Sequence, residues 1–245
     1  MVKETLAKSI KYSVQKDVDD PKHMLEVIAI DLIALRSETN PNVKRNALEA
    51  LSTILHFGWT LVKDNLGDIV QFALVETTIR KELIDEIDLG PFKHKVDRGL
   101  PLRKAAFQTL ETVFLKAPDY VDVLQIVDAI VSSGLADTEE DNVVLTLHIL
   151  AKLTQKAGVV VMSRIENIVA AFEKLFQSNF KLISQKQSQE RAMNIIRAVL
   201  RVVYAFASSS ELQETPVPRF TDFLKNIVLV NADAKQMYER IALSA

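Results

Sequence analysis

The side chains that could perform chemistry in this 245-residue chain are few and scattered. The chain has no cysteine, which excludes thiol catalysis, disulfide bonds and cysteine-ligated zinc. Its histidines show neither metal-ligand spacing nor a HExxH motif; they are His23, His56, His94 and His148. The glycines stand singly, so no phosphate-binding loop is indicated. We therefore predict no catalytic residue, no metal site, no cofactor and no enzymatic activity.

Two charged clusters remain as candidate binding sites. The acidic cluster comprises Asp137, Glu139, Glu140 and Asp141. It lacks the glycine and alternating ligands of a calcium loop, and we interpret it as a capped, solvated helix start, where anions are favourable. The basic cluster comprises Lys93, Lys95, Arg98, Arg103 and Lys104. Acidic residues interleave with it and no row of aromatic side chains accompanies it, so an acidic protein surface suits it better than nucleic acid.

Overall composition supports a well-folded, protein-binding chain. A formal charge of -2 is not typical of a nucleic-acid binder, and 48% hydrophobic residues supply ample material for a core. No uncharged apolar run approaches the roughly 18 residues of a membrane span, and no signal peptide is evident. The lack of cysteine favours a reducing compartment. We expect a cytoplasmic and nuclear protein that binds neither nucleic acid nor membrane.

These side chains must be positioned by helices, because apolar residues recur every three or four positions along most of the chain. Two such stripes contain Val43, Ala47, Leu51, Ile54 and Leu55, and Leu102, Ala106, Leu110, Val113 and Phe114. Asn40-Pro41 and Gly99-Leu100-Pro101 are helix-opening signals, which predict helices near residues 41–57 and 101–116. Short connections imply antiparallel helix pairs. Residues 179–189 and 208–218 are polar enough to predict surface loops.

A repeated pattern indicates the architecture. Val43-Lys44-Arg45-Asn46-Ala47-Leu48 resembles Leu102-Arg103-Lys104-Ala105-Ala106-Phe107, with an offset of 59 residues between Ala47 and Ala106. Residues 80–97 are 18 residues without a helical pattern, and 59 minus 18 is 41, within the period of about 40 to 47 residues of HEAT repeats. Weaker copies begin near Asn142 and at Arg191-Ala192. We predict an all-α HEAT-repeat solenoid over residues 1–245, with one inserted β-hairpin at 80–97; an unrelated helical bundle is the alternative.

Within that insertion the period switches to two, which predicts two strands joined at Gly90-Pro91 by a type II′ turn. Facing residue numbers then sum to 181, which pairs Asp88 with Lys93, Glu86 with Lys95, Leu89 with Phe92, and Ile87 with His94. Ile87, Leu89, Phe92 and Val96 form the apolar face. This face either folds back over the chain's own helices or forms an exposed finger that docks into a partner.

Several of these segments resemble the end of the cullin-associated, neddylation-dissociated proteins. The resemblance is carried by Val62-Lys63-Asp64, Ile79-Arg80-Lys81-Glu82-Leu83-Ile84-Asp85, Leu89-Gly90-Pro91-Phe92-Lys93-His94-Lys95-Val96-Asp97 and Leu102-Arg103-Lys104-Ala105-Ala106-Phe107. Weaker similarity extends from Leu6 to Met237-Tyr238-Glu239-Arg240-Ile241. The chain departs from the family pattern near Asn142 to Leu147, which lacks a basic residue, and between Asn179 and Glu190.

The resemblance implies that this chain is the C-terminal fragment of a longer HEAT-repeat factor that regulates the assembly of cullin-RING ubiquitin ligases, the SCF complexes among them, and exchanges their substrate receptors. Its C-terminal repeats would hold the cullin N-terminal domain, beside the remainder of the full-length chain. The hairpin would compete with the substrate adaptor, and its implied partner-binding residues are Leu83, Ile84, Asp85, Glu86, Ile87, Asp88, Leu89, Gly90, Pro91, Phe92, Lys93, His94, Lys95, Val96 and Asp97. The alternative function is a general HEAT-repeat scaffold or transport receptor for another protein.

Overall fold

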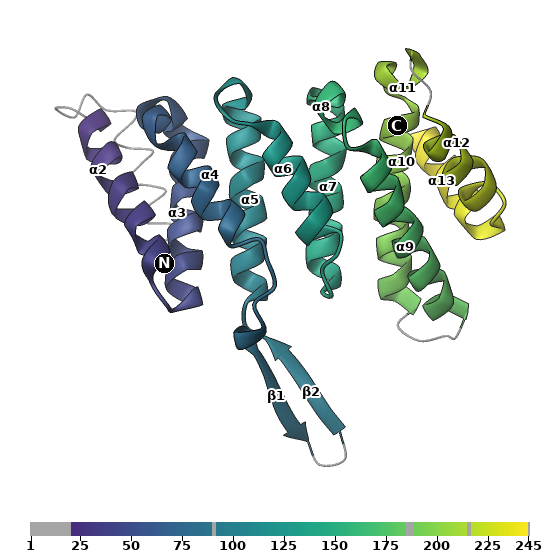
Figure 1. Ribbon diagram of the computed structural model, residues 1–245, viewed down its shortest axis with the longest axis horizontal. Helices are drawn as coiled ribbons and strands as arrows, with labels where there is room; N and C mark the ends of the chain where they lie inside the picture. The colour runs from purple at the N-terminus through teal and green to yellow at the C-terminus, as the bar shows by residue number, and fades with distance from the viewer. Residues whose placement is uncertain (1–20, 90–91, 185–188, 215–216, 245) are drawn as a thin grey trace. The chain divides into compact units, whose positions relative to one another are not determined.

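A computed structural model describes residues 21–89, 92–184, 189–214 and 217–244, and these form helices and a hairpin that projects from them (Figure 1). The helices are α2 (Pro21–Ala34), α3 (Pro41–Gly58), α4 (Leu66–Val75), α5 (Leu100–Lys116), α6 (Val123–Ala129), α7 (Glu140–Lys156), α8 (Gly158–Met162), α9 (Ile165–Ser184), α10 (Gln189–Ala207), α11 (Ser210–Glu214), α12 (Pro218–Phe223) and α13 (Ala232–Ser244). The strands are β1 (Ile84–Leu89) and β2 (Phe92–Asp97). The predicted class, all-α with an inserted β-hairpin, is confirmed.

The chain divides into two compact units, Met1–Ile126 and Val127–Ala245. In the first unit α3 packs along α5, α2 packs on α3, and α4 packs on α5. In the second unit α10 contacts α7, α9 and α13, while α12 packs on α9. Each unit is thus a set of helix pairs packed side by side, the arrangement of HEAT repeats (Figure 1). That both units form one continuous array stays a prediction.

Helix α3 begins where the sequence predicts, because Asn40 Oδ1 accepts a hydrogen bond from the Asn42 amide at 2.9 Å and Pro41 occupies the first turn. Helix α5 likewise opens with a proline in its first turn. The predicted helices 41–57 and 101–116 are therefore confirmed to within one residue at each end.

The buried positions of α3 recur in α5 and again in α7. Ala47, Leu51 and Ile54 are buried, and so are Ala106, Leu110 and Val113, each 59 positions later. The corresponding residues of α7 are Thr146, Leu150 and Leu153, which are also buried and lie a further 40 positions on. Without the hairpin the period is therefore 40 residues, which matches a HEAT unit.

The two predicted loops are largely helical instead. Helix α9 continues to Ser184 and α10 begins at Gln189, so only residues 185–188 of the first loop lie outside the described part of the chain. Asn179 is 5% exposed and its Nδ2 donates to the Leu175 carbonyl at 2.8 Å, which satisfies this polar side chain inside the helix. In the second loop, α11 occupies residues 210–214. Polar composition was misleading because Lys, Gln and Glu are good helix formers.

Close packing in the second unit depends on Gly134, the last residue of the π-helical turn Ile130–Gly134 that follows α6. A Cβ atom at this position would lie 2.5 Å from Cγ2 of Thr146, whose side chain is fully buried. Thr146 has little freedom to move away, because a β-branched side chain in a helix has few allowed rotamers. The contact between this turn and α7 therefore requires a residue without a side chain.

We predict that Gly134→Ala destabilises the second unit by about 1–3 kcal/mol, since the added methyl group overpacks a filled core. Gly67→Ala is the matched control, because a Cβ there meets nothing within 4 Å in helix α4. That change should stabilise by about 0.4–1 kcal/mol through the unfolded chain. Urea unfolding followed by circular dichroism measures both. Equal or greater stability of Gly134→Ala would show that the turn can move away from α7.

Candidate protein-binding hairpin

The two strands of the insertion pair in the predicted register. Ile84 faces Asp97, Glu86 faces Lys95, and Leu89 faces Phe92, so every facing pair sums to 181. A slip of one residue would exchange the two faces of the hairpin, so this register decides which side chains a partner meets. The Gly90-Pro91 turn, for which we predicted type II′ geometry, lies outside the described residues.

On the charged face of the hairpin, the ion pair of Glu86 with Lys95 is solvated. Lys95 Nζ lies 3.7 Å from Glu86 Oε1, and their side chains are 72% and 52% exposed. An exposed pair of this kind contributes at most about 1 kcal/mol. The predicted partnership of Glu86 with Lys95 is confirmed, and its role is to support the register rather than the stability of the chain.

The opposite face carries apolar side chains that the helices leave uncovered. Ile87 is 45% exposed, and Val96 is half-buried. Both strands extend away from the helices of the first unit and contact mainly each other (Figure 1). Of the two alternatives that the sequence left open, the exposed finger fits this arrangement. The side chains of five strand residues lie outside the described part; they are Asp88, Leu89, Phe92, Lys93 and His94.

Where the hairpin leaves the helices, its two arms are joined by backbone hydrogen bonds. The Leu83 amide donates to the Arg80 carbonyl at 3.0 Å, which closes a 3₁₀ turn before β1. The Arg98 amide donates to the Leu83 carbonyl at 2.9 Å and so connects the end of β2 to that turn. An exposed ion pair, Arg98 Nε with Asp85 Oδ2 at 2.6 Å, lies just outside.

A buried ion pair attaches β2 to helix α5. Arg103 NH1 lies 2.8 Å from Asp97 Oδ2, and the two side chains are only 2% and 7% exposed. The other oxygen of Asp97 accepts a hydrogen bond from the Gly99 amide at 2.7 Å. Asp97 therefore binds both the helix start and a side chain one turn into the helix, which fixes where the strand ends and the helix begins.

A second buried pair attaches the other arm. Lys44 Nζ of α3 lies 2.8 Å from Oε1 of Glu76, which follows α4 and is 2% exposed. The other carboxylate oxygen of Glu76 lies 2.7 Å from Arg80 NH2. Because one buried carboxylate is shared by two cations from different segments, the chain entering the hairpin is held against α3.

A similar arrangement recurs at the start of α7. Asp137 Oδ1 accepts from the Glu139 amide at 2.9 Å, and Oδ2 accepts from Asn142 Nδ2 at 2.7 Å. Asn142 thus supplies a neutral donor to this carboxylate, one position before the place that corresponds to Arg103 in the 40-residue repeat. Glu140 and Asp141 lie in the first turn of α7, as predicted for a helix start. The predicted capped, solvated cluster is wrong in two respects, because the N-cap residue Glu139 makes no side-chain capping hydrogen bond and Asp137 is buried at 8% exposure.

Sequence reasoning missed these buried partners and counted Arg103 in a basic cluster suited to an acidic protein surface. A signal was available, because Asp97 and Asp137 lie one repeat of 40 residues apart and each precedes a helix start. Within the described residues, no group of three or more metal-ligating side chains occurs. None of the helices searched there is long and apolar enough to cross a membrane.

Comparison with known proteins identifies relatives over most of the chain. The family model described as TATA-binding protein interacting (TIP20) matches residues 61–228. "Cullin-associated NEDD8-dissociated protein 1" of Drosophila melanogaster is 32% identical over 228 residues, which cover 92% of this chain and 18% of the relative. The Arabidopsis thaliana protein of the same name is 34% identical over 202 residues, 81% of this chain and 16% of the relative. "Cullin-associated NEDD8-dissociated protein 2" of Rattus norvegicus is 28% identical over 214 residues, 87% of this chain and 17% of the relative. The chain therefore spans less than a fifth of the length of these relatives.

The buried pair at the base of β2 predicts a large effect of a single substitution. Arg103→Gln should lower the free energy of unfolding by about 3–5 kcal/mol, because it leaves the Asp97 carboxylate buried without its cation. The double variant Asp97→Asn with Arg103→Gln should be less destabilised than the sum of the two single variants.

The exposed pair of the same hairpin supplies the control. Arg98→Gln removes the contact with Asp85, whose side chain is 46% exposed, and should cost at most about 1 kcal/mol. Urea titration of all variants measures the difference. Similar losses for Arg98→Gln and Arg103→Gln would contradict a special role of the buried pair.

Proposed function

Since this chain belongs to the family of cullin-associated, NEDD8-dissociated proteins, we propose that it binds a cullin and regulates the assembly of cullin-RING ubiquitin ligases. The names of its relatives support the partner, and the helix-pair fold supports a role in binding. The proposed mode of action is contact alone, with no chemical step carried out by this chain. The cullin surface that we propose for it is the N-terminal domain.

The observation that carries the finer proposal is the projecting hairpin. A two-stranded hairpin is only marginally stable by itself in water. An apolar face that stays exposed on such a hairpin is therefore typical of a surface that a partner protein covers. Ile87 lies on that face, and the register places Leu89 and Phe92 opposite each other beside the turn. Buried ion pairs hold both arms at the base, so little order would be lost on docking.

We propose that the hairpin, Leu83 to Asp97, docks on the cullin where a substrate adaptor would otherwise bind. If the hairpin and the adaptor need the same cullin surface, they exclude each other sterically and no conformational change is required. Displacement then requires only that the hairpin reach the shared surface, and the free energy comes from burial of its apolar tip. The exposed pair of Glu86 with Lys95 would stay at the rim of this contact.

We also propose that further repeats of a longer chain pack on α2. This helix exposes an apolar stripe of Met24, Val27 and Ile30, at 40%, 43% and 50%. The spacing of three residues places the stripe along a single face of the helix. Covering such a face with another helix is the usual way in which a solenoid continues.

We predict that the hairpin tip, Leu89 and Phe92, is required for cullin binding. Leu89→Ala with Phe92→Ala should weaken binding to a cullin N-terminal domain by at least about tenfold, because full burial of each side chain contributes about 1.5–3 kcal/mol. Glu86→Gln with Lys95→Gln, on the opposite face, should bind within about twofold of the unchanged chain, since rim charges contribute little. Calorimetric titration measures the affinities.

The melting temperature separates recognition from structure. Because the strands contact mainly each other, the tip variant should melt within about a degree or two of the unchanged chain. A large drop in melting temperature with unchanged cullin affinity would identify the hairpin as a structural cap. Absence of cullin binding by the unchanged chain, with capture of an unrelated protein, would favour a general scaffold.

A competition experiment tests displacement separately. A cullin N-terminal domain saturated with its substrate adaptor should not be retained by the immobilised chain, whereas the free domain should be. Added chain should also speed the release of labelled adaptor, and the tip variant should not. Formation of a stable ternary complex of chain, cullin and adaptor would contradict a shared surface while leaving cullin binding intact.

A further inference from the structure

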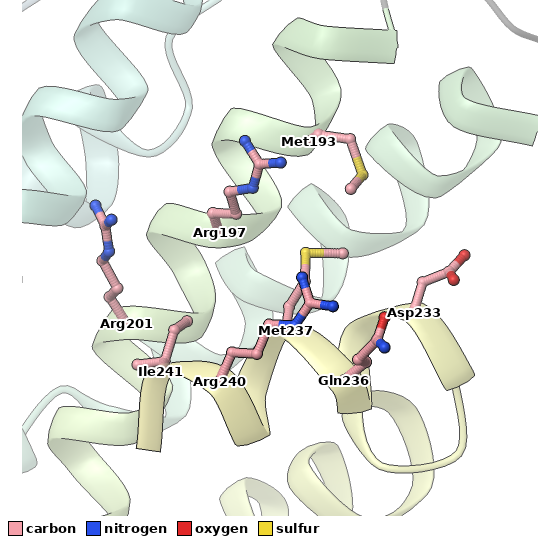
Figure 2. Close-up of a pocket in the computed structure, with 8 residues that line it drawn as sticks. All are labelled: Met193, Arg197, Arg201, Asp233, Gln236, Met237, Arg240 and Ile241. Atoms are coloured by element: carbon pink, nitrogen blue, oxygen red, sulfur yellow. The ribbon is translucent and has the colours of Figure 1, made fainter. Parts of the chain in front are cut away.

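A groove with an arginine-rich lining lies in the second unit, between α10 and α13 (Figure 2). Its volume is about 260 Å³. Met193, Arg197 and Arg201 come from α10, and Asp233, Gln236, Met237, Arg240 and Ile241 come from α13. A second, larger pocket of about 560 Å³ shares Arg201 and Ile241 with it and continues along α10 toward α11. The two together provide room for an extended occupant rather than a small molecule.

The arginines of this groove differ from the other arginines of the unit. Arg164 and Arg219 each contact a carboxylate, Asp128 at 2.6 Å and Glu173 at 2.7 Å. Arg197 instead lies 3.4 Å from the neutral Asn194 side chain, and Arg201 lies 3.5 Å from a nitrogen of His148. Among the described residues, no ion pair to a carboxylate is found for Arg197, Arg201 or Arg240.

Folding alone does not account for this charge arrangement. Arg197 and Arg201 are four positions apart on α10, and like charges at this spacing destabilise a helix. Glu190 is the sole acidic residue of α10 and lies in its first turn, two turns before Arg197. Arg240 of α13 adds a third positive charge at the same groove. An external carboxylate would relieve the repulsion that these side chains create.

The apolar part of the groove is equally open to a partner. Met193, Met237 and Ile241 line it and are each only half-buried. Methionine is flexible and polarisable, so a surface built from it adapts to the apolar side chains of a partner. Asp233, the acidic residue of the lining, lies at the other end of the groove from Arg201 (Figure 2). Arg197 and Arg240 lie between these two residues, beside Met193 and Met237, so positive charge and apolar side chains adjoin in the middle of the groove (Figure 2).

We propose that this groove binds an acidic amphipathic segment of a partner protein. Its carboxylates lie against Arg197 and Arg240, whose planar guanidinium groups match the geometry of a carboxylate. Its apolar side chains lie on Met193, Met237 and Ile241, as in other grooves that accept one face of an amphipathic helix. The site goes beyond the proposed function, because it belongs to the second unit and uses none of the hairpin residues.

A protein segment fits this groove better than a nucleic acid. The groove between α10 and α13 has no aromatic ring in its lining on which a base could stack, and Met193, Met237 and Ile241 make part of it apolar. Of the two pockets, the larger one is lined by Tyr204, whose ring packs against that of Tyr238 with centroids 6.2 Å apart. The chain as a whole carries a formal charge of -2, so there is no broad positive field to attract a polyanion. The positive charge is instead local and is combined with methionine.

The test uses fluorescein-labelled synthetic peptides and the full 245-residue chain. The probe peptide carries leucine and glutamate at helical spacing, and two further peptides replace all glutamates by glutamine or all leucines by serine. Fluorescence anisotropy should show binding of the first peptide and at least about tenfold weaker binding of the other two, since both the charges and the apolar face contribute.

Charge reversal locates the site. Arg197→Glu with Arg240→Glu should weaken binding of the probe peptide at least about tenfold, because it removes two cations and adds like-charge repulsion. Lys174→Glu with Lys225→Glu makes the same change in net charge at exposed positions of the same unit outside the groove lining, and should change the affinity less than about twofold.

Several outcomes would overturn the proposal. These are no binding of the probe peptide, equal losses in both charge-reversal variants, and unchanged binding of the serine peptide, which would reveal an electrostatic site for any polyanion. Tighter binding of single-stranded nucleic acid than of the probe peptide would also overturn the proposal. The hairpin-tip variant should bind the probe peptide normally, so a failure here is distinguishable from a failure of cullin binding.

Discussion

The hairpin depends on buried contacts between opposite charges at its base. Asp97 is nearly inaccessible and faces Arg103, while Glu76 is shared by Lys44 and Arg80. Burying these charges costs desolvation energy, so such pairs are rarely the cheapest way to hold helices together. These pairs instead fix the orientation of the hairpin, because each carboxylate accepts contacts only from a few defined positions. The strands therefore leave the helices at a fixed point and along a fixed line.

That anchoring separates the stability of the fold from the properties of the hairpin tip. The helices bury their apolar stripes against one another and do not need the strands to do so. The strands are held by their own register, by an exposed ion pair and by the buried carboxylates at the base. Changes near the turn can consequently alter what the hairpin recognises while the helical core stays intact. In a repeat protein such insertions are tolerated, since each repeat contacts only its neighbours.

The two candidate surfaces of this chain use different physical chemistry. The hairpin of the first unit offers apolar side chains on a projection held at its base by buried ion pairs, which suits a hollow on a partner. The groove of the second unit offers arginines beside methionines, which suits a projecting acidic segment. Affinity at the first depends mainly on buried area, and specificity at the second depends on charge. A chain that carries both can distinguish among partners that share only one of the matching features.

Much of the architecture could be derived from the sequence because it rests on local rules. Helix starts followed from Asn40-Pro41, the period of two predicted both strands, and the sum of 181 predicted every pair in the register, since side-chain period and turn position leave one solution. The same reasoning failed between Asn179 and Ser184, where polar residues continue a helix.

The sequence determined the elements, but only the tertiary structure decided which charges are paired and buried. Arg103 and Lys44 look like surface cations in the sequence, yet their carboxylate partners come from other segments and remove them from water. Arg197, Arg201 and Arg240 look no different in the sequence, yet they line an open groove. Burial of a charge depends on what packs over it, and that is a property of distant segments brought together by folding.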